Sequence, residues 1–196
     1  MKLLGHINHW RADPTGWIGS AIMFLFAAVA AFKWQSTGLI FYALVTLRDV
    51  AASWFLLTRN QTLQKSRFGF QDVLAYVSSS MPLMYFSHAE GTPFSLSVTA
   101  SVLAIVGFVL STLSLFELGS SFGVSPANRG YIKTGIYRFI KHPMYTGYAI
   151  GEVGLALLNP LNVLVFALST TLYWLRTRYE KLALSIPKKS ELKLSE

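Results

Sequence analysis

Six apolar stretches, separated by short polar segments, dominate the chain. The second and fourth are long enough for a helix to cross about 30 Å of hydrocarbon, whereas the third, fifth and sixth need tilt or flanking residues to do so. The pattern predicts an all-α fold, a polytopic integral membrane bundle of about six transmembrane helices. The stretches cover residues 16–32, 38–57, 73–86, 96–116, 144–158 and 161–175.

The connections between these stretches predict how the helices are grouped. Asn159-Pro160 is the break between the last two stretches, so the chain should close with a tight helical hairpin. No internal repeat and no change of composition marks a second soluble domain. We divide the chain into residues 1–115, which hold four N-terminal spans, and residues 116–196, which hold a loop, the two-span hairpin and a basic tail.

Composition supports the membrane assignment and excludes several kinds of chemistry. Only 13% of the residues are charged and 53% are hydrophobic, whereas a soluble domain carries about 25% charged residues. The absence of cysteine excludes disulfides and thiolate nucleophiles. The 4 histidines are scattered along the chain, so we expect no metal site.

The distribution of basic residues predicts the topology. The net charge of +8 suits anionic lipid neighbours, and we expect no nucleic-acid partner. Fifteen of the 17 Lys and Arg residues fall in segments on one side of the predicted spans; the exceptions are Lys33 and Arg48. The positive-inside rule therefore predicts that both termini are cytoplasmic, and we expect the inner or plasma membrane of a prokaryote. Ala28-Val29-Ala30 resembles a signal-peptide cleavage site, but its apolar run is long for a signal peptide, so we expect an uncleaved first helix.

Unusual residues concentrate just before the fifth span. His142 precedes Pro143, which disfavours helix at His142 and suits the first position of the following helix. The positive dipole end of that helix, beside Arg138 and Lys141, would attract a carboxylate or phosphate. The alternative is a juxtamembrane loop whose basic residues meet lipid headgroups.

Ionisable residues inside the spans are costly and mark either structure or function. Glu152 shares a helix face with Tyr145 and Tyr148, so it is either a polar group in a substrate pocket or a structural hydrogen-bonding residue. Adjacent helical residues point about 100° apart, so Arg48 and Asp49 need not pair with each other; they are either structural or part of a transport path.

Glycines in the fifth span predict close helix packing. Gly147, Gly151 and Gly154 lie on one helix face, and we expect that face to pack against the sixth span.

Arg176 and Glu180 lie four residues apart at the cytoplasmic end of the sixth span. They either form a salt bridge or act together, with the arginine holding a carboxylate and the glutamate holding hydroxyls or an amine. The hairpin should bring them to the same membrane face as His142.

Taken together, these motifs resemble the isoprenylcysteine carboxyl methyltransferase family, whose superfamily includes membrane phospholipid methyltransferases. The resemblance covers about residues 115 to 185, and Lys181 stands where the family usually has a second glutamate. The matching motifs are Gly135-x-Tyr137, Lys141-His142-Pro143-x-Tyr145-x-Gly147-Tyr148 and Arg176-x-x-x-Glu180.

The resemblance implies an S-adenosylmethionine-dependent methyltransferase with its cofactor pocket on the cytoplasmic side. Carried over by position, Arg176 and Glu180 complete that pocket and face the methyl acceptor. If the acceptor must lose a proton, Glu152 or His142 is our candidate base. The residues implied in cofactor binding are Gly135, Tyr137, His142, Pro143, Tyr145 and Glu180.

We therefore expect methyl transfer to a lipophilic or prenylated acceptor at the cytoplasmic membrane face. A prenylated cysteine carboxylate, a phospholipid amine, a small thiol and another lipid all remain open as acceptors. The alternatives are a small transporter or channel subunit that uses the intramembrane charges, and a non-catalytic family member. The spans show no inverted repeat of the kind found in many transporters.

Overall fold

The computed structural model describes residues 14–59, 69–125 and 132–185, and all of its regular elements are helical. The all-α prediction is therefore confirmed for the described part of the chain. In chain order the elements are α2 (Pro14–Thr37), α3 (Ile40–Thr58), α4 (Phe70–Ser80), η2 (Met81–Met84), α5 (Phe94–Leu118), η3 (Gly119–Ser121), η4 (Gly135–Arg138), α6 (Pro143–Leu158) and α7 (Asn162–Ser185).

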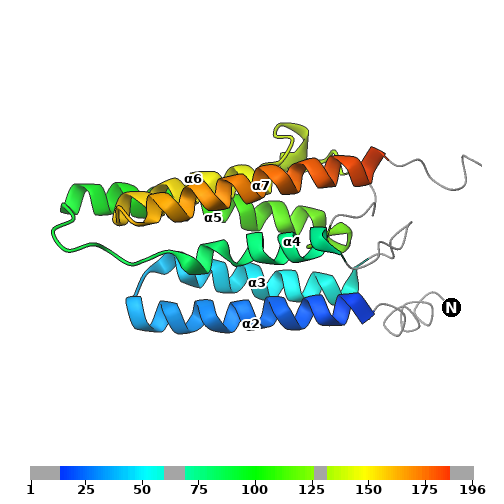
Figure 1. The fold of residues 1–196 in the computed structure, drawn as a ribbon, viewed down its shortest axis with the longest axis horizontal. Helices are drawn as coiled ribbons and strands as arrows, with labels where there is room; N and C mark the ends of the chain where they lie inside the picture. Colours follow the sequence, from blue (N-terminus) through cyan, green and yellow to red (C-terminus); the bar gives the residue numbers. More distant parts are fainter. Residues whose placement is uncertain (1–13, 60–68, 126–131, 186–196) are drawn as a thin grey trace, which may run out of the picture.

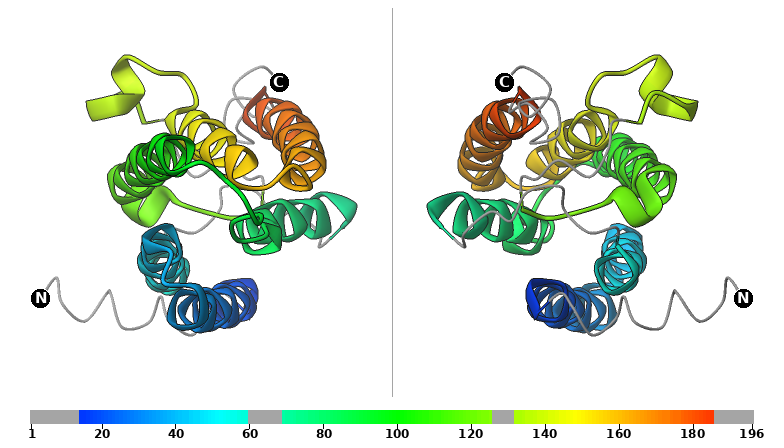
Figure 2. Two further views of the ribbon diagram at one scale, coloured as in Figure 1. Left: turned by 90° about the vertical axis from the view of Figure 1, so that its left-hand side faces the viewer. Right: turned by 90° about the vertical axis from the view of Figure 1, so that its right-hand side faces the viewer.

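The long helices lie side by side along one axis (Figure 1). Viewed along that axis, α2 and α3 form one layer, α4 and α5 a second, and α6 and α7 a third (Figure 2). The end of α3, the start of α4 and the end of α7 lie at one end of the bundle. The described segments that were predicted to be cytoplasmic thus share one end.

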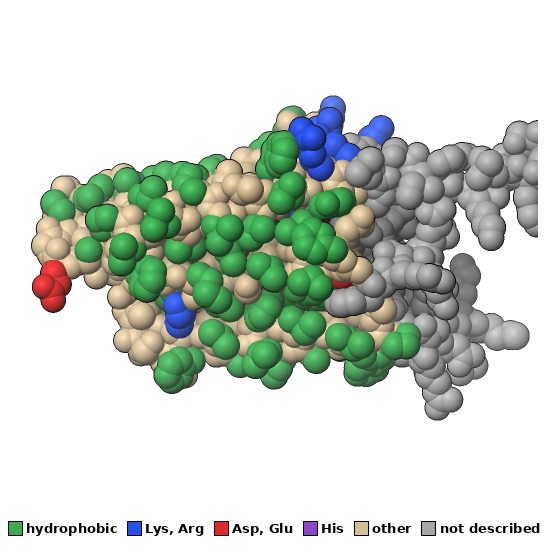
Figure 3. All heavy atoms as spheres, in the orientation of Figure 1, with side chains coloured by type: hydrophobic (Ala, Val, Ile, Leu, Met, Phe, Trp, Pro, Cys, Tyr) green, Lys and Arg blue, Asp and Glu red, His purple; other side chains and the backbone are tan. Residues whose placement is uncertain are grey.

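Within the described ranges, three helices are long and apolar enough to cross a membrane: α2, α3 and the stretch Phe94–Ser121, which is α5 with η3. Helix α6, with 16 residues, reaches only about 24 Å. The count of six spans therefore stays a prediction. Exposed apolar side chains are spread along the face of the bundle seen in Figure 3, as expected for a surface that contacts lipid.

The short third span results from local sequence. Helix α4 begins where the Asp72 carboxylate accepts a hydrogen bond from the Gly69 N–H at 2.7 Å, which caps the helix. It gives way to η2 at Met81 because Pro82 cannot continue the α-helical hydrogen bonding. The chain then runs without a helix to Phe94.

The hydrogen bonds of Lys33 explain why this lysine lies away from the other basic residues. Its ammonium group donates hydrogen bonds to the carbonyls of Leu83 at 2.6 Å and Tyr85 at 3.2 Å, and to the Tyr42 hydroxyl at 3.3 Å. The lysine therefore supplies partners for carbonyls that the end of η2 leaves unpaired, and it ties α2 to η2 and α3.

The predicted hairpin between the last two helices is confirmed. The side chain of Asn162, at the start of α7, donates to the Leu155 carbonyl at 2.8 Å. Its amide group also bonds the backbone of Phe86, accepting from the N–H at 2.8 Å and donating to the carbonyl at 3.0 Å. One buried amide thus joins α6, α7 and the loop that precedes α5.

The close packing expected of the α6 glycines is confirmed, but the predicted partner was wrong. A Cβ atom on Gly154 would lie 2.4 Å from the Ala100 carbonyl oxygen, and one on Gly147 would lie 2.6 Å from that of Gly107. Both contacts are with α5 rather than with α7. The physical reason is that α5 offers small residues of its own at this face, so the two backbones can approach closely.

Candidate functional site

The start of α6 holds His142 in a fixed position. His142 has the non-helical angles φ −135° and ψ 66°, and Pro143 follows within the first turn, as the sequence predicted. The His142 carbonyl accepts bonds from the Thr146 N–H at 3.0 Å and from the Thr146 hydroxyl at 3.1 Å. Within the described residues, the Nε2 atom of His142 is buried and has no hydrogen-bond partner.

Burial sets the charge state of His142. Loss of solvent lowers the pKa of the imidazole, and Glu180 opposes that change by favouring the charged form. Lys181 and Lys141 add to the lowering. The net direction is downward, so the neutral imidazole is favoured at neutral pH.

The end of α7 contacts the start of α6 through Tyr145 and Glu180. The Tyr145 hydroxyl donates a hydrogen bond to Oε1 of Glu180. The Nε atom of Arg176 lies 3.4 Å from the same oxygen, and its guanidinium sits 5.5 Å from the Tyr145 ring centroid. The structure thus brings the motif around Tyr145 together with the Arg176-x-x-x-Glu180 motif, as expected from the predicted hairpin.

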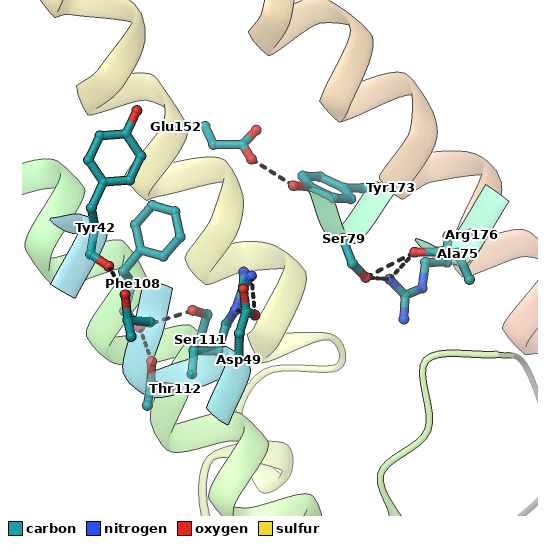
Figure 4. Close-up of polar contacts among 12 residues, drawn as sticks. Tyr42, Asp49, Ala75, Ser79, Phe108, Ser111, Thr112, Glu152, Tyr173 and Arg176 are labelled. Atoms are coloured by element: carbon teal, nitrogen blue, oxygen red, sulfur yellow. Dashed lines mark hydrogen bonds and ion pairs between the residues drawn. The ribbon is translucent and has the colours of Figure 1, made fainter. Parts of the chain in front are cut away.

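Most of the Arg176 guanidinium is occupied by the protein itself. Nη1 donates to the Ser79 hydroxyl at 3.0 Å and the Ala75 carbonyl at 3.3 Å (Figure 4). Nη1 also donates to the Ser78 hydroxyl at 3.2 Å, and Nη2 donates to the Val124 carbonyl at 2.8 Å. The arginine therefore joins α7 to α4 and to the segment after η3, and only Nε lacks a hydrogen bond within the described residues.

Gly135 and Glu117 define the loop that precedes the site. The Ile136 N–H donates to both carboxylate oxygens of Glu117, at 2.8 and 3.1 Å. Gly135 has φ +53°, and a Cβ atom there would lie 2.1 Å from Glu117 Oε1. Glycine is therefore required both for its backbone conformation and for this close approach.

Tyr137 in η4 lies near the carboxylates of Glu180 and Glu117. Burial raises the pKa of its phenol, and the nearby Tyr148, Glu180 and Glu117 raise it further. Its hydroxyl therefore stays protonated. This places Tyr137 in the group of residues around Glu180.

Glu152 lies deeper in the bundle. It is ten residues after His142, or about 15 Å along the helix axis, and its side chain is fully buried. Its Oε1 accepts a bond from the Tyr173 hydroxyl at 2.6 Å (Figure 4). Its Oε2 accepts bonds from the Tyr85 hydroxyl at 3.1 Å and from the Ser169 hydroxyl. The carboxylate is thus held by three hydroxyl donors.

The rings of three tyrosines connect the carboxylate of Glu152 to that of Glu180. The Tyr173 ring lies 5.8 Å from that of Tyr145 and 5.4 Å from that of Tyr148, and the last two are 6.3 Å apart between centroids. Tyr173 was not among the predicted site residues. Its spacing was a usable signal, since it precedes Arg176 by three residues and Glu180 by seven, on one helix face.

Arg48 and Asp49 pair with each other, although adjacent helical positions did not require it. The Arg48 Nε atom donates to Asp49 Oδ1 at 2.7 Å. The arginine side chain is long enough to curl back onto Asp49. The guanidinium also lies 5.2 Å from the Tyr148 ring centroid, so α3 contacts α6 at this point.

Comparison with known proteins finds similarity over the C-terminal part of the chain. Residues 95–185 match the model of a family described as phospholipid methyltransferase. The chain is also similar to protein-S-isoprenylcysteine O-methyltransferase of Saccharomyces cerevisiae (strain ATCC 204508 / S288c), with 31% identity over 91 residues. That alignment covers 43% of this chain and 38% of the yeast protein. No solved structure matches the chain significantly.

Proposed function

With residues 95–185 in the phospholipid methyltransferase family, we propose that this chain is an integral membrane methyltransferase. In this proposal the methyl donor is S-adenosylmethionine, and the acceptor is a lipophilic molecule that arrives laterally from the bilayer. Transfer takes place at the end of the bundle that holds η4 and the end of α7, which we assign to the cytoplasmic face.

The contact between Tyr145 and Glu180 carries the proposal. It joins the residues that follow the His-Pro pair to the Arg-x-x-x-Glu pair, although the two motifs lie 35 positions apart in the chain. Two motifs that meet in space at one end of a helical hairpin are best explained by a common ligand. The side chain of Glu180 keeps 27% of its surface exposed, so it remains accessible to such a ligand.

The residues present suit S-adenosylmethionine. Glu180 can accept hydrogen bonds from hydroxyl or ammonium groups, and the buried Nε2 of His142 lacks a partner within the described residues. The rings of Tyr145 and Tyr148 each face an arginine on one side, Arg176 and Arg48, so a sulfonium would need the opposite face of a ring. Gly135 and Tyr137 would enclose the ligand from the loop side, and Arg176 would hold Glu180 in place.

When bound, the donor supplies an already activated methyl group, so the protein must chiefly position the acceptor and exclude water. A carboxylate acceptor needs no base, whereas an amine or thiol must lose a proton. The contacts favour His142 for that step, because its imidazole is neutral and its Nε2 is unengaged. Both Glu152 oxygens are occupied by hydroxyl donors, so Glu152 is better suited to hold Tyr173 and Tyr85 in position.

Binding of S-adenosylhomocysteine, the demethylated product, to the purified protein tests the proposal. We expect saturable binding that Glu180→Gln weakens about tenfold or more, since a charge-assisted hydrogen bond is lost. Glu90→Gln is the matched control, because Glu90 is exposed on the loop at the opposite end of the bundle. Absence of saturable binding at millimolar ligand would contradict a cofactor site. Arg176→Ala is a poor test because Arg176 anchors α4.

A further inference from the structure

Helix η4 and the residues that follow it have an outer side that the proposed methyl-transfer site does not use. Arg138, Phe139 and Lys141 are all exposed there, and Phe139 is 83% exposed. Tyr137 and His142, which belong to the proposed site, are more buried. The segment therefore has two sides, an inner one toward the bundle and an outer one that carries an aromatic ring between basic residues.

The exposed charged side chains at this end of the bundle, within the described ranges, are all basic. The acidic residues there are engaged: the Glu117 carboxylate accepts from the Ile136 N–H, that of Asp72 caps α4, and that of Glu180 bonds Tyr145. Figure 3 shows Lys and Arg side chains gathered over the part of the bundle where η4 lies. A surface of one sign favours an anionic partner. The exposed basic residues are Lys133, Arg138, Lys141, Arg178 and Lys181.

Trp174 and Arg178 indicate where the membrane surface crosses α7. Trp174 is 52% exposed, and the Arg178 guanidinium lies 4.1 Å from the centroid of its ring. Tryptophan is enriched at membrane–water interfaces, and an arginine near a helix end directs its charged group toward the headgroups. In Figure 1, η4 stands beside this half of α7 and not beyond the end of the helix. It therefore lies close to the level of the interface.

The direction in which η4 projects brings it to lipid. Viewed along the bundle axis, η4 stands out from the side of the bundle, past α5 and α6 (Figure 2). Where the long axis of a bundle crosses the membrane, such a sideways projection runs along the plane of the bilayer. Exposure of a phenylalanine to water is unfavourable, whereas aromatic and basic side chains together are typical of segments that lie in the interface.

We propose that the outer side of η4 is an interfacial anchor that binds anionic phospholipid headgroups of the bilayer. Phe139 inserts at the boundary of headgroups and acyl chains, and Arg138 and Lys141 pair with lipid phosphates. The lipid is a component of the surrounding bilayer on the outer side of the loop, and the inference does not depend on methyl transfer. The sequence left two interpretations of this basic loop, a ligand site and lipid contact; the two sides of η4 allow both.

A spin label at position 139 tests where η4 lies. The chain has no cysteine, so Phe139→Cys can be labelled selectively with a nitroxide, which is itself apolar, in the full chain in nanodiscs. Collisions with oxygen, which concentrates in lipid, and with a water-soluble nickel chelate report the depth of the label. Val106→Cys on the exposed side of α5 is the lipid reference, and Glu90→Cys on the opposite loop is the water reference. We expect the oxygen-to-nickel ratio at position 139 to exceed that at position 90 by about threefold or more.

The second measurement tests the anionic headgroup. Nanodiscs of phosphatidylcholine alone are compared with nanodiscs in which about one quarter of the lipid is phosphatidylglycerol. We expect the ratio at position 139 to rise by roughly half with the anionic lipid, and that at Val106→Cys to stay the same. Adding Arg138→Gln and Lys141→Gln to the labelled chain should remove most of the rise, whereas Arg138→Lys with Lys141→Arg, which keeps both charges, should retain it.

Three results would overturn the inference. A label at position 139 that is as accessible to the nickel chelate as the label at position 90 would leave this surface to water or to a soluble partner. No change with phosphatidylglycerol, or a rise that persists in the chain with both glutamines, would remove the anionic headgroup. All three substituted side chains are exposed, so the packing of the bundle is preserved. Binding of S-adenosylhomocysteine is measured separately, and its failure would leave the anchor unaffected.

Discussion

Buried polar side chains in this bundle are hydrogen-bonded at most of their atoms, and a few keep one atom without a partner in the described residues. Glu152 has a donor on each oxygen, and Arg176 bonds two serines and two carbonyls. Burying these side chains costs little free energy because each hydrogen bond within the protein replaces one to water. His142 and Arg48 each have a buried nitrogen without a hydrogen-bond partner in the described residues, and so does Arg176 at its Nε atom. In the proposed function, the open nitrogen of His142 is the one left for a ligand.

Gly135→Ala should disrupt the loop that carries η4. The added Cβ atom would lie 2.1 Å from Glu117 Oε1, so the carboxylate must leave the Ile136 N–H. Loss of a hydrogen bond to a charged group should raise hydrogen exchange at that amide by about tenfold or more. Gly91→Ala is the control, since Gly91 also has positive φ but has nothing within 4 Å of the added atom. Unchanged exchange in Gly135→Ala would refute the role of Glu117.

His142 should make stability depend on pH in the acid range. Its pKa is lowered in the folded protein from the ordinary value of 6.5, so the unfolded chain binds more protons between the lowered pKa and 6.5. The free energy of unfolding therefore falls as the pH drops through that window, and it is unaffected above it. We expect the unfolding temperature to decrease from pH 7 to pH 5, and to decrease less in His142→Gln.

His88→Gln is the control for this titration, because His88 is exposed at the opposite end of the bundle and contacts Ser97 at 2.8 Å. It should retain the wild-type pH dependence. An equal slope in His142→Gln and the wild type would show that the lowered pKa of His142 does not contribute.

At the scale of elements, sequence patterns predicted which faces pack closely but not which helices they meet. The small residues of α6 indicated a close approach, yet their partner α5 carries its own small residues within a strongly apolar helix, where they give little periodic signal. Likewise, the sequence placed Arg176 and Glu180 on one face but could not reveal the bonds from Arg176 to α4. Those bonds depend on a long-range arrangement of helices that local patterns do not encode.

Gly107→Ala tests the close approach of α5 and α6. A Cβ atom at Gly107 would lie 2.2 Å from the Gly151 backbone nitrogen, so the helices must separate or bend. We expect the free energy of unfolding to fall by about 1–3 kcal/mol, the usual range for overpacking. The measurement is the unfolding temperature in detergent, which should decrease. Val106→Ala is the control, since Val106 is 54% exposed on the same helix. Equal effects of the two substitutions would contradict the tight interface.

At the scale of the whole molecule, the sequence predicted the all-helical fold, whereas the site residues stay a prediction. The apolar stretches match helices because hydrophobic segments of this length form helices in lipid. The motif residues from α6 and α7 meet because a short hairpin leaves them no other arrangement. The spacing of Tyr173 offered a signal, but its contacts with Glu152 and with the other tyrosine rings depend on which helices surround α6.

The orientation of the bundle in the membrane is the remaining whole-molecule prediction, and the lack of cysteine makes it directly testable. Glu90→Cys places a thiol on the loop before α5, and Thr134→Cys places one beside η4; both positions are exposed and lie at opposite ends of the bundle. The positive-inside rule predicts that an impermeant maleimide labels Glu90→Cys in intact cells and labels Thr134→Cys only after the membrane is opened. The reverse pattern would place the proposed site on the outer face, where a cytosolic methyl donor could not reach it.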